Sequence, residues 1–173
     1  MDNPTELTLS DVSLVTKTLL GNNAYTIADN IEGANKFGTG PVRSAYIAMC
    51  HTDLTSDLER VDRFRHKNDY PSANEALDSE WGAIGNIRFL VSSIGSKLPN
   101  ASNRGRDVYN IFVSGLQAYG CVEQDGMSAS FIYRPAIYDG PLALNISVGY
   151  KFAEVSRILN DAWLIKLQAT LMI

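Results

Sequence analysis

The sequence has little of what would point to a secreted or a membrane-spanning protein. Its 173 residues hold two cysteines, Cys50 and Cys121, which are too few for a disulfide framework. Both lie among apolar neighbours, and we therefore expect buried free thiols in a reducing compartment. No apolar run approaches the roughly 18 residues that a membrane-spanning helix needs. The acidic N-terminal segment lacks the apolar core of a signal peptide, so we expect a soluble protein made in a cytoplasm.

Positive charge is also scarce. Fifteen Lys and Arg stand against 19 Asp and Glu, which gives a net charge of −4 and a pI near 5.1. This balance argues against a dedicated nucleic-acid binder, and we expect no sequence-specific binding of nucleic acid. Apolar residues make up 45% of the chain and are spread along it, which excludes disorder and supplies one core of ordinary size.

The N-terminal residues up to Gly21 are predicted to form a helix. Thr8 is placed as its N-cap, with Asp11 in the capping-box position three residues later. Gly21, followed by two asparagines, is a stop signal. Apolar residues at helical spacing define the buried face: Val12, Val15 and Leu19.

A second helical pattern follows a short apolar run at residues 43–49, which predicts a buried strand. Thr52 is the expected N-cap of this helix, and its apolar stripe consists of Leu54, Leu58 and Val61. The charged residues are expected on the solvent side: Asp53, Asp57, Glu59, Arg60, Asp62 and Arg63. A capping pair at Ser72 and Glu75 predicts a short third helix that reaches about residue 79.

The rest of the chain is dominated by extended segments. Gly82 and Gly85 predict a turn before a strand at residues 87–91, and another strand is expected at 108–113. Between these strands, residues 94–106 are expected to form a polar loop that carries Lys97, Arg104 and Arg106. Further extended segments are predicted at residues 131–134, 145–152 and 162–173. The irregular order of helices and strands predicts a mixed α+β fold.

The strongest candidate for chemistry is Cys50-His51-Thr52-Asp53. His51 and Asp53, with Asp57 one turn later, suggest a metal cluster, but no third ligand has suitable spacing. Cys50 beside His51 suggests a nucleophile and base, but adjacent residues rarely present both groups to one substrate. We favour a structural role: a buried Cys50 and a helix N-terminus served by Thr52 and Asp53.

Other candidates are weaker still. His66 stands among charged residues and is expected on a solvated face, and Glu123 with Asp125 is expected in a turn. Gly38 and Gly40 lack the Gly-Lys-Ser/Thr of a phosphate loop. The basic residues of loop 94–106 could touch phosphate, but a solvated or protein-facing loop is favoured. We assign no catalytic, cofactor-binding or metal-binding residue, and we expect neither a cofactor nor an enzyme.

An ordered set of segments runs from residue 46 to about 161. It consists of residues 46–54 with 57–58, 80–89, 108–113 with 118–120, 139–142, 148–151 and 157–161. It includes the strand, His-x-Asp and helix sequence at residues 46–58 and the Ala-Tyr-Gly of residues 118–120. Together these segments resemble the Hong Kong 97-type fold of tailed-phage major capsid proteins. The resemblance implies a structural protein of a phage capsid.

Members of that family have an extended N-terminal arm, a projecting two-stranded loop, a peripheral domain with a long spine helix, and an axial domain. The resemblance implies that this chain lacks the arm, the loop and the spine helix. It assigns residues 1–115 to an axial-type domain and residues 116–173 to returning strands of the peripheral-type domain. The chain would then be a truncated or prophage-derived form, or a fragment.

The implied function is self-assembly into hexamers and pentamers of an icosahedral shell that encloses DNA. Its place would be the virion, with assembly in the host cytoplasm, and further partners would be scaffolding, portal or decoration proteins, with no membrane. One alternative is the shell of a bacterial nanocompartment that encloses a cargo enzyme. Another is a small hydrolase or metal enzyme that uses Cys50, His51 and Asp53.

Overall fold

The computed structural model of the protein describes residues 5–31, 42–71, 76–102, 104–123, 130–135 and 145–172. It divides into two compact units, Met1–Ala118 with Asn160–Ile173, and Tyr119–Leu159. The first unit contains both α-helices of the described chain and a large sheet, whereas the second consists of paired strands. The mixed α+β prediction is confirmed. None of the described helices is long and apolar enough to cross a membrane.

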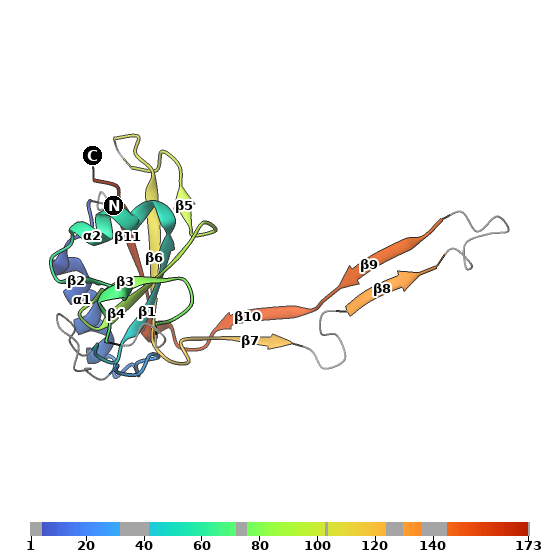
Figure 1. Ribbon diagram of the computed structural model, residues 1–173, viewed down its shortest axis with the longest axis horizontal. Coiled ribbons are helices and arrows are strands. Elements are labelled where there is room, and N and C mark those ends of the chain that lie inside the picture. Colours follow the sequence, from blue (N-terminus) through green and yellow to red (C-terminus); the bar gives the residue numbers. More distant parts are fainter. Residues whose placement is uncertain are drawn as a thin grey trace. The chain divides into compact units, whose positions relative to one another are not determined.

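The first unit is built on a seven-stranded sheet with the order β11-β6-β1-β4-β3-β2, and β5 pairs with β6 (Figure 1). Its strands are β1 (Tyr46–His51), β2 (Phe64–His66), β3 (Glu80–Ile84), β4 (Ile87–Ser92), β5 (Lys97–Leu98), β6 (Val108–Ser114) and β11 (Leu164–Thr170). The β1–β4 pair is parallel, and the other pairs of this sheet are antiparallel.

One face of this sheet carries the core. The helices α1 (Leu9–Gly21) and α2 (Thr55–Arg60) lie beside the sheet (Figure 1), and their apolar residues join one cluster with those of the strands. Alternate residues of the central strands point into it: Tyr46, Ala48 and Cys50 of β1, and Tyr109, Ile111 and Val113 of β6. The opposite face is more polar, and Gln168 there donates a hydrogen bond to Asn110 at 2.9 Å. The sheet therefore follows the one-sided pattern of antiparallel sheets.

The predicted N-terminal helix is confirmed together with its cap. The Asp11 N–H donates to the Thr8 hydroxyl at 3.4 Å, and the Asp11 carboxylate accepts from the Thr8 N–H at 2.9 Å. The predicted buried residues of this helix are buried as well: Val12, Val15 and Leu19. A capping box is local in sequence, so it needs no distant partner to be recognised.

The second helix begins differently from the prediction. A 3₁₀ turn at Thr52–Leu54 precedes α2, and its N-cap is His51 rather than Thr52, because His51 Nδ1 accepts the Asp53 N–H at 3.0 Å. The predicted stripe of Leu54, Leu58 and Val61 is buried. The prediction that Asp57 faces solvent is wrong. Its buried carboxylate accepts the Met172 N–H at 2.9 Å and so ties α2 to the last described residues.

Strands β3 and β2 contain two residues for which the sequence predicted other surroundings. The turn expected from Gly82 to Gly85 is wrong at Gly82, which lies inside β3, and only Gly85 has the positive φ of a turn. A Cβ at Gly82 would overlap the Arg65 carbonyl and the Phe64 ring, so glycine permits the close approach of β2. His66 is half-buried in β2 against the Trp81 ring, with centroids 5.0 Å apart, so the solvated face predicted for it is wrong.

Several other predictions can be placed. The strands predicted at residues 87–91 and 108–113 are β4 and β6. The strand predicted at residues 43–49 is β1, shifted to Tyr46–His51, and the loop at 94–106 contains the short strand β5. The capping pair of Ser72 and Glu75, and Gly38 and Gly40, lie outside the described residues, as does Asp125.

The last third of the chain is shared between the two units. Tyr119–Leu159 forms the second unit, whereas Asn160–Ile173 belongs to the first, because β11 pairs along its length with β6. The expected segment of returning strands at residues 116–173 is thus divided, and its assignment to a peripheral-type domain stays a prediction. The same holds for the missing arm, projecting loop and spine helix. The longest helix of the described chain is α1.

The second unit is an antiparallel ribbon made of two successive pairs of strands. Strand β7 (Tyr119–Glu123) pairs with β10 (Glu154–Ile158), and β8 (Ser130–Arg134) pairs with β9 (Ser147–Lys151). In the Ala-Tyr-Gly segment of residues 118–120, Tyr119 and Gly120 begin β7. Neither pair is joined to a third strand among the described residues.

A buried ion pair links β3 and β4. Arg88 and Glu80 are almost inaccessible to solvent, and Arg88 Nε lies 4.0 Å from Glu80 Oε1. The Glu80 carboxylate also accepts the Tyr70 hydroxyl at 2.6 Å and the Leu77 N–H at 2.8 Å. Arg88 donates to the Asp29 carbonyl at 2.6 Å. Burial, together with the Glu80 hydrogen bond, raises the pKa of Tyr70.

We expect Arg88→Met to lower the free energy of unfolding by about 3–5 kcal/mol, because it leaves the Glu80 carboxylate buried without its cation. Adding Glu80→Gln to this variant should restore part of the loss, since the amide oxygen still accepts from Tyr70. Urea denaturation measures both effects. Asp62→Asn, at an exposed residue without a partner in the described chain, is the control and should change little. A double variant that is less stable than Arg88→Met alone would contradict the prediction.

Candidate functional site

A cluster of polar side chains surrounds Asp53 at the end of β1. The Tyr109 hydroxyl donates to Asp53 Oδ2 at 2.9 Å, and Lys97 Nζ lies 3.4 Å from the same oxygen. Lys97 also pairs with Asp107 at 3.0 Å and lies 5.3 Å from the centroid of the Tyr109 ring. The cluster therefore joins the 3₁₀ turn after β1 to β5 and β6.

His51 belongs to this cluster through its ring. Its centroid lies 5.6 Å from that of Tyr109. Its Nδ1 accepts the Asp53 N–H, so this nitrogen carries no proton in this arrangement. The approach of Asp53 Oδ2 to the same atom at 3.3 Å is then a close contact and not a salt bridge. His51 serves here as a cap.

The charges of the cluster stabilise one another. The hydrogen bond from Tyr109 lowers the pKa of Asp53, and Lys97 lowers it further. The Asn100 N–H, with Lys97, lowers the pKa of Asp107. The pKa of Lys97 is raised by the Tyr109 hydroxyl and by Asp107, while burial raises the pKa of Tyr109. These shifts favour a charged Lys97 between the carboxylates of Asp53 and Asp107. This arrangement indicates a structural role for the cluster.

The two cysteines differ in environment. Cys50 is buried, and burial raises its pKa to about 12, so it is a thiol and not a thiolate at neutral pH. Its burial was predicted correctly, whereas the burial predicted for Cys121 is wrong. Cys121 lies on β7 opposite Ser156, and the two side chains are 3.2 Å apart. Apolar neighbours in sequence failed as a sign of burial because a two-stranded ribbon has no core.

His51 and Asp53 lie close together in the structure, but they do not form a metal site with a third ligand from the described residues. In the described part of the chain, no group of three or more His, Cys, Asp or Glu residues is placed to hold a metal ion. Asp57, the third residue of the suggested cluster, is engaged with the Met172 N–H and with Arg60, 3.9 Å away.

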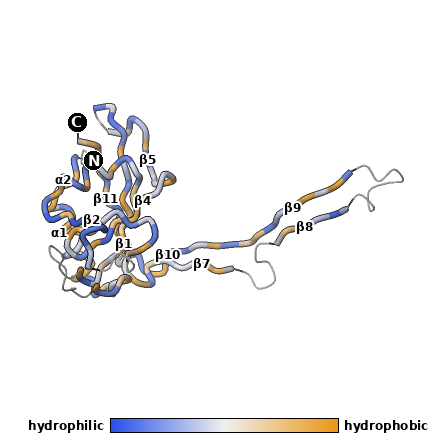
Figure 2. Tube along the Cα trace, viewed as in Figure 1, coloured by the Kyte–Doolittle hydropathy of each residue, from blue (hydrophilic) through white to orange (hydrophobic). Residues whose placement is uncertain are grey.

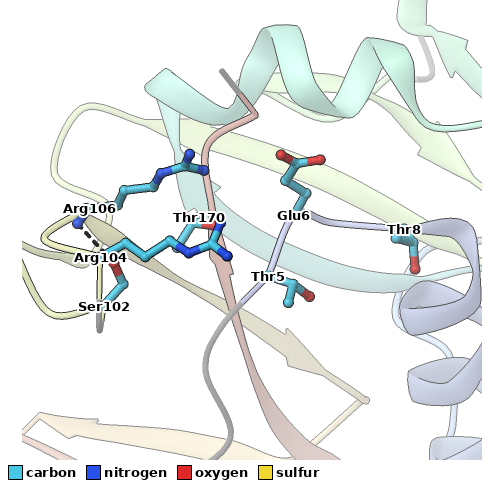
Figure 3. A pocket seen from close by; sticks show the side chains of 7 residues that line it. All are labelled: Thr5, Glu6, Thr8, Ser102, Arg104, Arg106 and Thr170. Carbon is cyan, nitrogen blue, oxygen red and sulfur yellow. Dashed lines mark hydrogen bonds between the residues drawn. The ribbon is translucent and has the colours of Figure 1, made fainter.

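The basic residues of loop 94–106 are divided between two places. Lys97 belongs to the Asp53 cluster, while Arg104 and Arg106 line a cavity of about 350 Å³ (Figure 3). Its other wall is the N-terminal segment with Thr5 and Glu6 (Figure 3). The Glu6 carboxylate on that wall offsets part of the positive charge. A single phosphate-binding loop, the alternative considered from sequence, is therefore not formed.

The feature that the sequence did not reveal is an exposed apolar face on the second unit. In the β8–β9 register Phe131 lies opposite Tyr150 and Tyr133 opposite Val148, which places the four side chains on one face. Phe152 extends this face, with its ring centroid 5.7 Å from that of Tyr150. We call these five residues the apolar ribbon face; they are 56–69% exposed. Figure 2 shows hydrophobic residues along β8 and β9.

The opposite face of the same ribbon is mostly polar. It carries Ser130 with Lys151 and Arg134 with Ser147, besides Ile132 and Gly149. The ribbon is therefore amphipathic like a strand pair of a sandwich, but the described chain places nothing over its apolar side. Alternation of apolar and polar residues in 147–151 is the sequence signal that could have indicated it, whereas Ile132 interrupts the alternation in 130–134.

Comparison with solved structures shows a distant likeness. No family model and no curated protein matches the chain. A chain from the head structure of Helicobacter pylori bacteriophage KHP40 is similar to it, with 13% identity, a TM-score of 0.49 and coverage of 97% of this chain. This chain spans 59% of the length of that phage chain. No residue role follows from this likeness.

We expect Tyr109→Phe to destabilise the first unit in a pH-dependent way. The hydrogen bond that it removes holds the pKa of Asp53 below the ordinary 3.8. At pH 7 the loss should be about 0.5–1 kcal/mol, because Asp53 is partly exposed and solvent screens its charge. As the pH falls below 3.8 and through the lowered pKa of Asp53, this carboxylate becomes protonated in the folded state too, so the difference from the unsubstituted protein should shrink.

Thermal unfolding between pH 3 and pH 7 measures this difference. Tyr25→Phe, at an exposed tyrosine of the same unit, is the control and should show no such trend. A gap for Tyr109→Phe that stays constant over this range would contradict the role of Asp53.

The cysteines provide a test of the burial assignments. In the native protein a thiol reagent should modify Cys121 rapidly and leave Cys50 unmodified, because Cys50 is buried and its pKa is about 12. Mass spectrometry before and after unfolding counts the modified thiols. The Cys121→Ser variant should react only after unfolding, and rapid reaction of this variant in the native state would show that Cys50 is accessible.

Proposed function

We propose that this protein is a structural subunit of a phage capsid and acts by binding other copies of itself. The observation that carries the proposal is the apolar ribbon face. A two-stranded ribbon alone is marginally stable in water. Five large apolar side chains on one of its faces make exposure of that face to water unfavourable in free energy. Such a surface is suited to an interface.

A second copy of the chain is the occupant that we propose for this face. Strands β8 and β9 carry Arg134 and Lys151 and no acidic residue, and both cations lie on the opposite, polar face of the strand pair. The apolar ribbon face therefore carries no charge that would repel a second copy of the acidic chain. The ribbon also has two free strand edges in the described chain, which can extend a sheet of another subunit.

The ordered resemblance of residues 46 to about 161 to the Hong Kong 97-type fold supports a shell rather than another assembly. In a shell each subunit meets identical neighbours through heterologous contacts that close into rings. The proposal places the protein in the virion, in hexamers and pentamers assembled in the host cytoplasm. It includes no catalytic role.

Val148→Glu tests the proposal, with Ser147→Glu as its matched control. The two residues are adjacent on β9 and exposed, but they point to opposite faces of the ribbon. Val148→Glu puts a charge on the apolar ribbon face and should weaken self-association at least about tenfold, or about 1.4 kcal/mol. Ser147→Glu adds the same charge beside Arg134 and should leave association nearly unchanged.

Sedimentation velocity across a range of concentrations measures association, and electron microscopy shows whether rings or shells form. The unsubstituted protein should associate as its concentration rises. Strictly monomeric protein at high concentration would overturn the proposal. Equal weakening by both variants would show that added charge, and not the apolar ribbon face, controls association.

A further inference from the structure

Two adjoining hollows on the first unit form one groove lined by basic side chains. Their volumes are about 610 Å³ and 340 Å³, and both are lined by Arg43, Arg63 and Gly85. The larger hollow adds Arg65 and the smaller adds Lys17 of α1. Asp69 is the one acid among the described lining residues. We call this surface the basic groove; its excess of positive charge stands out on a chain of net charge −4.

The two arginines shared by both hollows are available to a ligand. Arg43 and Arg63 are exposed, and neither makes an ion pair or hydrogen bond with any residue of the described chain. Three basic residues elsewhere are engaged, by contrast: Arg88 with Glu80, Arg60 with Asp57, and Lys97 with Asp107. The groove therefore brings two guanidinium groups without a partner in the described chain to one place.

The backbone at Arg63 is unusual. Its φ is +67°, in the left-handed region that glycine or asparagine occupies at lower cost. This residue lies where the chain leaves α2 and enters β2, a place where a small residue would serve the turn better. An arginine here adds charge to the groove at a position that local structure does not favour.

The composition of the groove matches phosphate better than an acidic protein segment. Guanidinium groups bind phosphate oxygens in pairs of parallel hydrogen bonds, and three of the four cations are arginines. Protein interfaces depend on accessible apolar or aromatic anchors. In the larger hollow Val42 and Ala83 are buried and Phe64 is half-buried, so its accessible lining is mainly charged, whereas the smaller hollow also contains the exposed Leu20.

We propose that the basic groove binds the phosphodiester backbone of nucleic acid without reading its sequence. Net charge excludes a dedicated binder that holds nucleic acid by long-range attraction, but it does not exclude a local patch of four cations. Such contacts are short-ranged, weak and sensitive to salt. The inference goes beyond self-association and does not depend on it, since a single copy contains the whole groove.

Fluorescence anisotropy with a short labelled DNA duplex tests the proposal, measured on dilute protein at several salt concentrations. If about three phosphates are neutralised, the logarithm of the binding constant should fall against the logarithm of salt with a slope of about −3. The double variant Arg43→Gln/Arg63→Gln should reduce that slope by about 2. Both residues are exposed, so folding should be preserved, and circular dichroism checks this.

The double variant Arg104→Gln/Arg106→Gln is the matched control. It removes the same charge from the cavity in Figure 3, outside the groove, and should leave the slope unchanged. Equal losses from the two double variants would show that net charge alone is responsible and would overturn the proposal. So would the lack of any binding at low salt, or displacement of the DNA by polyglutamate of equal charge. Each of these results would leave self-association untouched.

Discussion

The buried pair of Glu80 and Arg88 is the constraint on which much of the first unit depends. Charges removed from water must be matched by charge and hydrogen bonds, and here the matching groups come from separate segments: Tyr70, Leu77 and Asp29. The pair therefore fixes not only the β3–β4 hairpin but also the chain on both sides of β2. Two hydrophobic side chains could fill the same volume without needing hydrogen-bond partners from neighbouring segments.

Strand β2 and the basic groove inherit their positions from this arrangement. Phe64, Arg65 and His66 pair with Ile84, Ala83 and Gly82 of β3, and β3 is held by Glu80. The close approach that Gly82 permits brings the Arg65 backbone against β3. Arg65 lies in the short edge strand β2, and Arg63 lies just before it. The buried Glu80 of β3 therefore helps to determine where these two charged side chains lie.

The sequence predicted those features whose causes are local. The capping box of Thr8 and Asp11 and the stripe of Leu54, Leu58 and Val61 depend on residues three or four apart, and both are present in the structure. Features with distant partners were missed. The burial of Asp57 depends on Met172, and the place of Gly82 within a strand depends on β2. Neither partner can be inferred from the residues next to Asp57 or Gly82 in sequence.

The candidate sites follow the same rule. The structural reading of His51 and Asp53 needed only their place at a helix start, but their partners Lys97 and Tyr109 lie on strands that the loop 94–106 brings back. The segments of the apolar ribbon face were predicted as extended. That its apolar residues share one face follows from the register, in which Phe131 lies opposite Tyr150. Register depends on which residues of two separate segments pair, and the periodicity within one segment does not show this.

The ribbon and the first unit differ in what stabilises them, and this difference bears on assembly. The first unit has a core of its own, whereas the strands of the ribbon expose their largest side chains: Phe131, Tyr133, Val148, Tyr150 and Phe152. A partner that covers these residues adds to the stability of the ribbon in proportion to its concentration, because it binds the ordered ribbon in preference to an unfolded one. In the proposed capsid subunit, order in the second unit and association between copies would therefore be coupled. The core of the first unit involves no residue of the ribbon, so a subunit with a formed core could join its neighbours before its ribbon is covered.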